Sequence, residues 1–148
     1  KLFAFGLGFG DSRVYTDDSS QYVEMWGGWT PTFGDDGELA PAQSLRWGET
    51  WYPIWQIGGV VRATSRLALQ AERTGDELKL GVFAIEPTSC KLEVFAQSRM
   101  LTERQLILSP TAPYIETLPL AAGNATAPLI VRIVDAQQQV LLTYTLDS

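Results

Sequence analysis

Regular alternation of apolar and polar residues runs through the second half of the chain and limits what this half can fold into. Apolar side chains at every second position are typical of a strand with one buried face. Seven such segments follow one another, bounded by Pro, Gly, Asn or Asp: residues 67–71, 78–82, 92–96, 101–108, 114–120, 128–134 and 140–146. Gly75-Asp76 is a turn signal, and Asp135 to Gln139 has the composition of a hairpin loop. No segment has the periodicity of a helix.

Short strands with turns at this spacing indicate a β-sandwich. We therefore predict an all-β fold, with an antiparallel β-sandwich of immunoglobulin-like or fibronectin-III-like type over residues 61–148. Residues 1–60 are predicted to be β as well, but less regular, with one long strand over Gln43 to Trp55 and a loop over Thr30 to Pro41. Shorter strands are expected at Leu2 to Leu7, Arg13 to Thr16 and Gln21 to Trp26.

The composition changes near Val60, which predicts two domains, 1–60 and 61–148. The first holds all 5 Trp and 10 of the 13 Gly. Its 8 acidic and 3 basic residues give a net charge of −5, whereas 9 acidic and 8 basic residues leave the second at −1. A segment as short as the first rarely forms a core alone. We expect it to pair with an upstream domain of a longer parent chain or to pack on the second domain.

The chain has no histidine, which removes the usual acid–base group near neutral pH and any Ser–His or Cys–His nucleophilic centre. Its single cysteine, Cys90, can form neither an internal disulfide nor a multi-thiolate zinc site. A net charge of −6 argues against nucleic acid and anionic membranes as partners. No apolar run is long enough to span a membrane. The low cysteine content favours the cytoplasm.

Acidic residues gather in two predicted loops, at Asp17-Asp18 and at Asp35-Asp36-x-Glu38. A calcium site needs about six oxygen ligands at suitable spacing, and the EF-hand pattern is missing. These residues are interpreted as turn-forming and solvated. Neither a metal nor another cofactor is expected.

Two stretches of the first domain resemble a known family. Val14 to Phe33 includes Trp-Gly-Gly-Trp-Thr-Pro, and Leu39 to Pro53 includes Trp-Gly-Glu-Thr-Trp-Tyr-Pro. Together they resemble the C-terminal part of galactose-mutarotase-like, or aldose epimerase-like, domains. They are also similar to a group of uncharacterised bacterial proteins in which such a domain precedes a β-sandwich and often helical repeats. The resemblance implies that residues 1–60 are the last strands of a mutarotase-like sandwich that binds carbohydrate.

Glu24 matches the family's catalytic glutamate, and Leu39 to Ala42 matches a turn in which Ala42 replaces the usual glycine. The resemblance thus implies that Glu24 is a general base, whereas a glutamate on a strand edge can equally be a solvated surface residue. The family's histidines have no counterpart in this chain. Without them the isolated chain lacks the family's complete acid–base set, so we expect no catalysis by the chain alone.

Tryptophans supply the other candidate binding residues. Trp26 and Trp29 flank Gly27-Gly28, and an indole on a loop can stack on the apolar face of a sugar ring. On the predicted strand, three further indoles would share one face with Glu49: Trp47, Trp51 and Trp55. We interpret this stripe as a buried seam between the two domains, with a sugar-binding surface as the alternative.

Three functions therefore stay open. The first is carbohydrate binding by a non-catalytic piece of a larger protein, with Glu24, Trp26 and Trp29 in the site. The second is part of an aldose 1-epimerase-type enzyme whose histidines lie upstream. The third is a structural β-module that spaces or docks other domains. The sequence identifies neither the sugar nor the oligomeric state.

Overall fold

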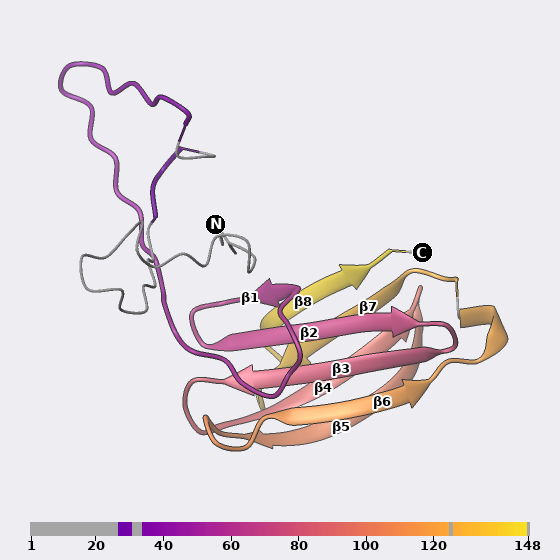
Figure 1. The fold of residues 1–148 in the computed structure, drawn as a ribbon. Helices are drawn as coiled ribbons and strands as arrows, with labels where there is room; N and C mark the ends of the chain where they lie inside the picture. The colour runs from indigo at the N-terminus through magenta and orange to yellow at the C-terminus, as the bar shows by residue number, and fades with distance from the viewer. Residues whose placement is uncertain (1–26, 31–33, 125, 148) are drawn as a thin grey trace, which may run out of the picture. The chain divides into compact units, whose positions relative to one another are not determined.

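The computed structural model describes residues 27–30, 34–124 and 126–147. The chain forms two compact units, Lys1–Thr50 and Trp51–Ser148. Within the described residues all strands lie in the second unit (Figure 1). The strands expected before Gly27 fall outside the described residues.

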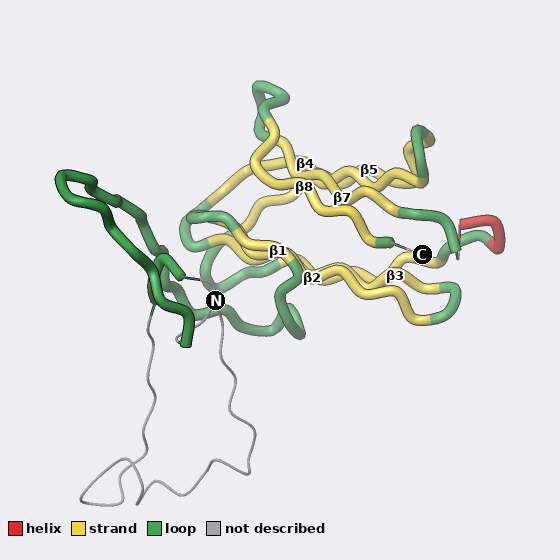
Figure 2. The backbone as a smooth tube through the Cα atoms, turned by 90° about the horizontal axis from the view of Figure 1, so that it is seen from above, coloured by secondary structure: helices red, strands yellow, loops and turns green. Residues whose placement is uncertain are grey.

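The second unit is a sandwich of two antiparallel four-stranded sheets, which Figure 2 shows as two layers. The sheets have the strand orders β1-β2-β3-β6 and β5-β4-β7-β8. The strands are β1 (Arg62–Ala63), β2 (Leu67–Thr74), β3 (Glu77–Ala84), β4 (Thr88–Ala96), β5 (Arg99–Leu108), β6 (Tyr114–Pro119), β7 (Leu129–Val134) and β8 (Val140–Leu146). A 3₁₀ turn, η3 (Ala122–Asn124), is the one helical element of the described residues. The all-β prediction is confirmed, and each of the seven predicted segments contains a strand.

The strand order is that of an immunoglobulin-type sandwich with one strand exchanged between sheets. β2, β3 and β6 correspond to strands A, B and E, and β4, β7 and β8 correspond to C, F and G. β5 pairs with β4 in the second sheet, so no strand occupies the place of D in the first. The short β1 extends the first sheet beside β2. This arrangement agrees with the predicted immunoglobulin-like or fibronectin-III-like sandwich.

Two hairpin loops form where the sequence predicts them. Gly75 links β2 to β3 with a φ of 61°, a conformation that glycine adopts without a steric penalty. At the last hairpin, the Asp135 carboxylate accepts hydrogen bonds from the backbone N–H groups of Gln137 (2.9 Å) and Gln139 (2.8 Å). Local turn chemistry therefore sets the pairing of β2 with β3 and supports that of β7 with β8.

The core lies between the two sheets and is built from the alternating apolar positions. Each long strand contributes side chains from one of its faces only. The largest fully buried ones are Leu67, Leu69, Leu78, Leu80, Val82, Leu92, Val94, Leu108, Leu129, Val131 and Ile133. Burial of a Leu or Val side chain is worth about 1.5–3 kcal/mol, so this layer is the main source of stability of the sandwich.

Charged side chains close one open side of the sandwich, where β5 and β6 are the edges of different sheets. Arg104 lies opposite Leu92 on β4, and Glu116 lies opposite Leu80 on β3, so both point inward. Arg104 Nη2 is 3.0 Å from Glu116 Oε1, and the Tyr114 hydroxyl donates to the same carboxylate. Inward-pointing charges on edge strands oppose pairing with another chain.

A segment without regular structure, residues 51–61, lies on the outer face of the β1-β2-β3-β6 sheet; we call it the strap. Figure 1 shows it crossing the sheet before the chain enters β1. Ile57 is buried and sits against Gly81, where an added Cβ would lie 2.7 Å from the Cβ of Ile57. Only a glycine on β3 leaves room for this contact. The strap thus belongs to the folded sandwich, although the composition assigns residues 51–60 to the first domain.

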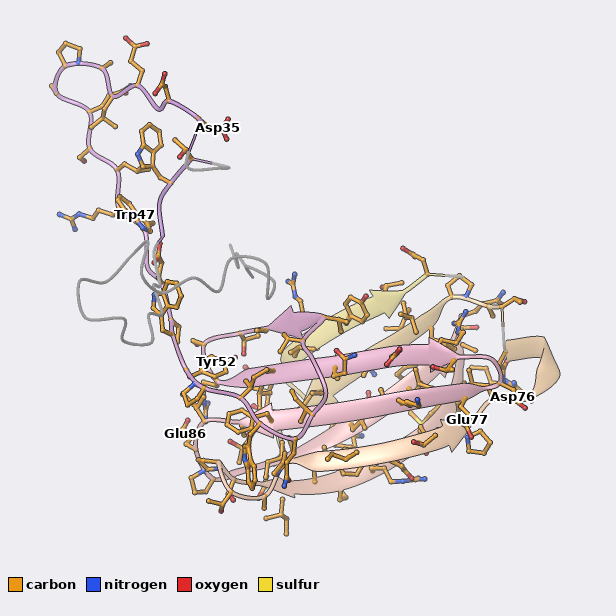
Figure 3. The ribbon with its side chains drawn as sticks, viewed as in Figure 1. Asp35, Trp47, Tyr52, Asp76, Glu77 and Glu86 are labelled. Carbon is orange, nitrogen blue, oxygen red and sulfur yellow. The ribbon has the colours of Figure 1, made fainter. Side chains whose placement is uncertain are left out.

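Tyr52 fixes the start of the strap, and Figure 3 shows its position beside the first residues of β2. Its ring stacks on Phe83, with 6.3 Å between ring centroids and 9° between planes. Its hydroxyl lies 2.9 Å from each of the carbonyl oxygens of Thr64 and Leu67, to which it donates. The strap therefore adds a second, smaller apolar cluster on the outside of the sheet: Ile57, Ala68 and Phe83, with Tyr52 and Ile85 at its margin.

The prediction of a long strand over Gln43 to Trp55 is wrong. Residues 43–55 form no strand; a turn at Pro41-Ala42 precedes them, and Pro53 interrupts them. Alternation alone does not make a strand, because a strand also needs a hydrogen-bonded neighbour. None of the described residues supplies one here.

Replacing Ile57 tests whether the strap is part of the folding unit. We expect Ile57→Ala to lower the free energy of unfolding of the chain by about 2 kcal/mol, because it empties the contact with Gly81 and Phe83. Urea unfolding followed by far-ultraviolet circular dichroism measures the loss. The matched control is Ile107→Ala, whose side chain is 87% exposed and should change stability by less than about 0.5 kcal/mol. Equal stability of both variants would show that the strap does not contribute.

Candidate functional site

Two of the three predicted site residues, Glu24 and Trp26, lie outside the described residues, as do Asp17 and Asp18. The third, Trp29, is described and is 46% exposed. It lies in the first unit with residues 34–50, where Figure 3 labels Asp35 and Trp47. The geometry of the candidate site can therefore be built around Trp29.

Trp29 and Trp47 belong to one group of contacts, which we call the indole cluster: Gly27, Trp29, Gly37, Trp47 and Glu49. The ring of Trp29 covers Gly37, where an added Cβ would be 2.1 Å from Cζ2. The carboxylate of Glu49 covers Gly27 in the same way, with Oε1 1.8 Å from an added Cβ. Two contacts thus hold residues 27–29 against residues 37–49. A side chain at position 37 would clash with the ring of Trp29, and one at position 27 would displace the carboxylate of Glu49.

Glu49 is the polar centre of the indole cluster. Its Oε1 accepts a hydrogen bond of 3.1 Å from Nε1 of Trp47. Trp47 is 57% exposed, so its ring keeps much of its surface open. An accessible indole beside a carboxylate offers an apolar face and a hydrogen-bond acceptor for a ligand that carries both apolar C–H groups and hydroxyl donors.

A tight turn shapes the segment that carries Trp47. The backbone N–H of Gln43 donates to the carbonyl of Ala40 (3.0 Å), and the side chain of Gln43 accepts from the N–H of Ala40 (3.2 Å). Pro41 and Ala42 are the two central residues, and Ala42 has a φ of 66°. This is the left-handed conformation that glycine favours.

The stripe of Trp47, Trp51 and Trp55 does not exist as predicted, because no strand aligns the three side chains. Trp47 lies in the first unit, whereas Trp51 and Trp55 belong to the strap of the second unit. The interpretation of one aromatic face that includes Glu49 is therefore wrong. The sequence gives no sign of the Trp47–Glu49 hydrogen bond or of the contact between Trp29 and Gly37.

The described residues contain no group of three or more Cys, Asp or Glu side chains arranged to hold a metal ion. Among the same residues no helix has the length and apolar character needed to cross a membrane.

Cys90 is buried, and burial raises the pKa of its thiol to about 11. A protonated, inaccessible thiol is a poor nucleophile.

The sequence gives no sign of a charged network on the outer face of the other sheet. Glu93 points away from the core on β4, yet its side chain is only 3% exposed. Lys91 Nζ is 2.8 Å from Oε1, and Arg132 Nη2 is 2.6 Å from Oε2. The guanidinium of Arg132 also lies over the ring of Phe95, 5.0 Å from its centroid. Burial by itself raises the pKa of Glu93, but the hydrogen bonds and charges of Lys91 and Arg132 outweigh it and hold the pKa below its usual range. This network is structural, since its partners satisfy both carboxylate oxygens.

Comparison with known proteins gives one family match. A model described as "YphG-like protein, second domain" matches residues 62–144, which is more than half of the chain. The matched range begins at β1 and ends within β8, so it covers the sandwich without the strap or the indole cluster. No curated protein sequence matches the chain.

Substitution of Glu93 tests the charged network. We expect Glu93→Gln to lower the free energy of unfolding by about 2 kcal/mol near neutral pH, because Lys91 and Arg132 lose a buried charged partner. The folded-state pKa of Glu93 is lowered, so its contribution is present above the unfolded-state pKa and is lost as the pH falls through the folded-state value. The stability difference between wild type and variant should therefore shrink in acid. Urea titrations at neutral and acidic pH measure both effects.

Glu86→Gln is the control for this experiment. Glu86 pairs with Arg66 at 2.7 Å, but both side chains are about half exposed. Such a pair contributes less than about 1 kcal/mol. If Glu93→Gln cost no more than Glu86→Gln at neutral pH, the network around Glu93 would not stabilise the sheet.

Proposed function

The chain belongs to the YphG-like protein family, and from this premise we propose that it is a piece of a larger protein that binds carbohydrate through its first unit. The proposed site is the indole cluster, together with Glu24 and Trp26. The sandwich of the second unit is the accessory domain. The proposed ligand is a neutral sugar, since its ring has an apolar face and hydroxyl groups.

The observation that carries the proposal is the pairing of the accessible Trp47 indole with the Glu49 carboxylate, next to the segment that carries Trp29. Trp29 and Trp47 are each about half exposed, and Glu49 lies between the two segments that hold them. A sugar ring can stack its C–H face on an indole and donate a hydroxyl hydrogen to a carboxylate. Exposed Trp side chains also leave apolar surface in contact with water, which is unfavourable unless a ligand covers them. The cluster therefore has the two kinds of group that sugar recognition needs.

The mutarotase-like resemblance of residues 14–53 supports the same proposal. In that resemblance Leu39 to Ala42 is a turn that ends in glycine, and Ala42 adopts the glycine-like φ of 66°. The resemblance also places Glu24 at the position of the family's catalytic glutamate. The chain has no histidine, and general acid–base ring opening needs a second group beside the carboxylate. We therefore propose binding, and not catalysis, for the chain on its own.

Calorimetric titration of the full chain with D-galactose and with D-glucose tests the proposal. We expect saturable binding of at least one sugar, and weaker binding in the double variant Trp29→Ala/Trp47→Ala. Loss of one stacking indole should weaken affinity about tenfold. The matched control is Leu45→Ala, which removes an exposed apolar side chain of the first unit outside the indole cluster. Absence of binding by wild type, or equal binding by wild type and double variant, would contradict the proposed site.

Glu24→Gln distinguishes a binding carboxylate from a catalytic one. In the full-length parent, a binding role predicts weaker sugar affinity and no mutarotation by wild type above the spontaneous rate. Polarimetry of freshly dissolved D-galactose measures that rate. Mutarotation by the parent that disappears in Glu24→Gln would instead assign the parent to the aldose epimerase-type enzymes, with Glu24 as its base.

A further inference from the structure

Trp55, in the strap of the second unit, is held at the surface by two fixed contacts. Its Nε1 donates a 2.7 Å hydrogen bond to the carbonyl of Pro110, in the loop between β5 and β6. Its own carbonyl accepts a 2.9 Å hydrogen bond from the N–H of Ile57, two residues on. Gln56, between them, has a φ of 62°. These contacts form a γ-turn whose central residue is left-handed, a rare and strained turn.

The strained turn directs the side chains of Trp55 and Ile57 to different environments. Ile57 points into the sheet and is buried against Gly81, while Trp55 stays 47% exposed. A positive φ is unfavourable for a residue with a side chain. Strain of this kind persists where the surrounding structure imposes it, and it is concentrated at ligand-binding positions. Here the strain fixes an indole ring that remains half open to solvent.

The two segments joined by the Trp55–Pro110 hydrogen bond carry no charged side chain. The strap, residues 51–61, and the stretch 107–115 that carries Pro110 include no Asp, Glu, Lys or Arg. Residues with hydroxyl groups precede and follow Pro110 in the sequence, and Ser109 Oγ and Thr111 Oγ1 are hydrogen-bonded to each other at 3.2 Å. Trp51 and Ile115 add further exposed apolar surface to these two segments.

We propose that Trp55 is the stacking platform of a second carbohydrate site, located on the sandwich itself and specific for neutral sugars. The ring of Trp55 takes the C–H face of a pyranose, and the hydroxyls of Ser109 and Thr111 exchange hydrogen bonds with its hydroxyl groups. The site is separate from the indole cluster and does not depend on it. It lies in the unit that carries the family match, although the strap precedes the matched residues.

The chemistry of the surface favours a sugar over other occupants. An anionic ligand or a charged peptide would need an opposite charge, and neither segment supplies one. The only donor of the Trp55 ring is already bound to Pro110, so the ring offers its faces and not its N–H group. The hydroxyls of Ser109 and Thr111 bond to each other, and each keeps lone pairs that can accept a hydrogen bond from a sugar hydroxyl but not from a wholly apolar partner. A pyranose satisfies both the ring and the hydroxyls.

Indole resonances in the ¹⁵N-labelled full chain test this site directly. The 5 Trp side chains give separate Nε1–H signals, and single Trp→Phe variants assign them. On titration with cellotetraose and maltotetraose at millimolar concentration, we expect a saturable shift of the Trp55 signal with at least one of them. The shift should persist in Trp29→Ala/Trp47→Ala, which separates this site from the first-unit site. If the first-unit site fails and the Trp55 shift remains, only the proposed function is contradicted.

Two variants address the roles of the ring and the hydroxyls. Trp55→Ala should weaken binding about tenfold or more. Because this change also removes the Pro110 contact, a second variant, Ser109→Ala/Thr111→Val, keeps the ring in place. It should weaken sugar binding several-fold. Its Trp55 signal in the free protein should stay at the wild-type position. No shift of Trp55 with either oligosaccharide overturns the proposal. A Trp55 signal that responds instead to protein concentration, or to an apolar peptide such as oligoproline, also overturns it.

Discussion

The apolar layer between the two sheets is the interaction on which the rest of the second unit depends. It is built from strands that bury alternate side chains, led by leucines such as Leu69, Leu80 and Leu92. Removal of these side chains from water is the main favourable term in folding. The layer also fixes which side chains must face outward. Glu93 and Phe83 lie on outer faces only because their neighbours along the strand are in the core.

The side chains that face away from the core are covered differently on the two sheets. On one sheet, the strap covers Phe83 and Ala68 and turns Trp55 toward solvent. On the other, Lys91 and Arg132 enclose Glu93. The first arrangement creates an accessible aromatic surface, whereas the second leaves no polar atom of Glu93 available. The difference explains why the proposed second site is on the strap side of the sandwich.

Local sequence predicted the parts of the fold that local chemistry determines. Alternation located the strands of the sandwich, and Gly75 and Asp135 located hairpin loops. The strand over Gln43 to Trp55 was wrong because alternation says nothing about whether a partner strand exists. The burial of Glu93 and the attachment of the strap also escaped prediction. Both depend on residues far apart in sequence, Glu93 with Arg132 and Ile57 with Gly81.

In the candidate sites, too, the sequence predicted local features but not contacts between distant residues. Trp29 was identified from its place beside Gly27-Gly28, but its contact with Gly37 requires the folded chain. Trp55 was assigned to a buried stripe, because nothing local reveals the Pro110 carbonyl that holds its ring.

The central claim is that these accessible indoles bind neutral sugars. Binding of the labelled full chain to an array of neutral mono- and oligosaccharides tests it most directly. The account predicts signal on at least one glycan, reduced by Trp29→Ala/Trp47→Ala or by Trp55→Ala; no signal on any glycan would contradict it.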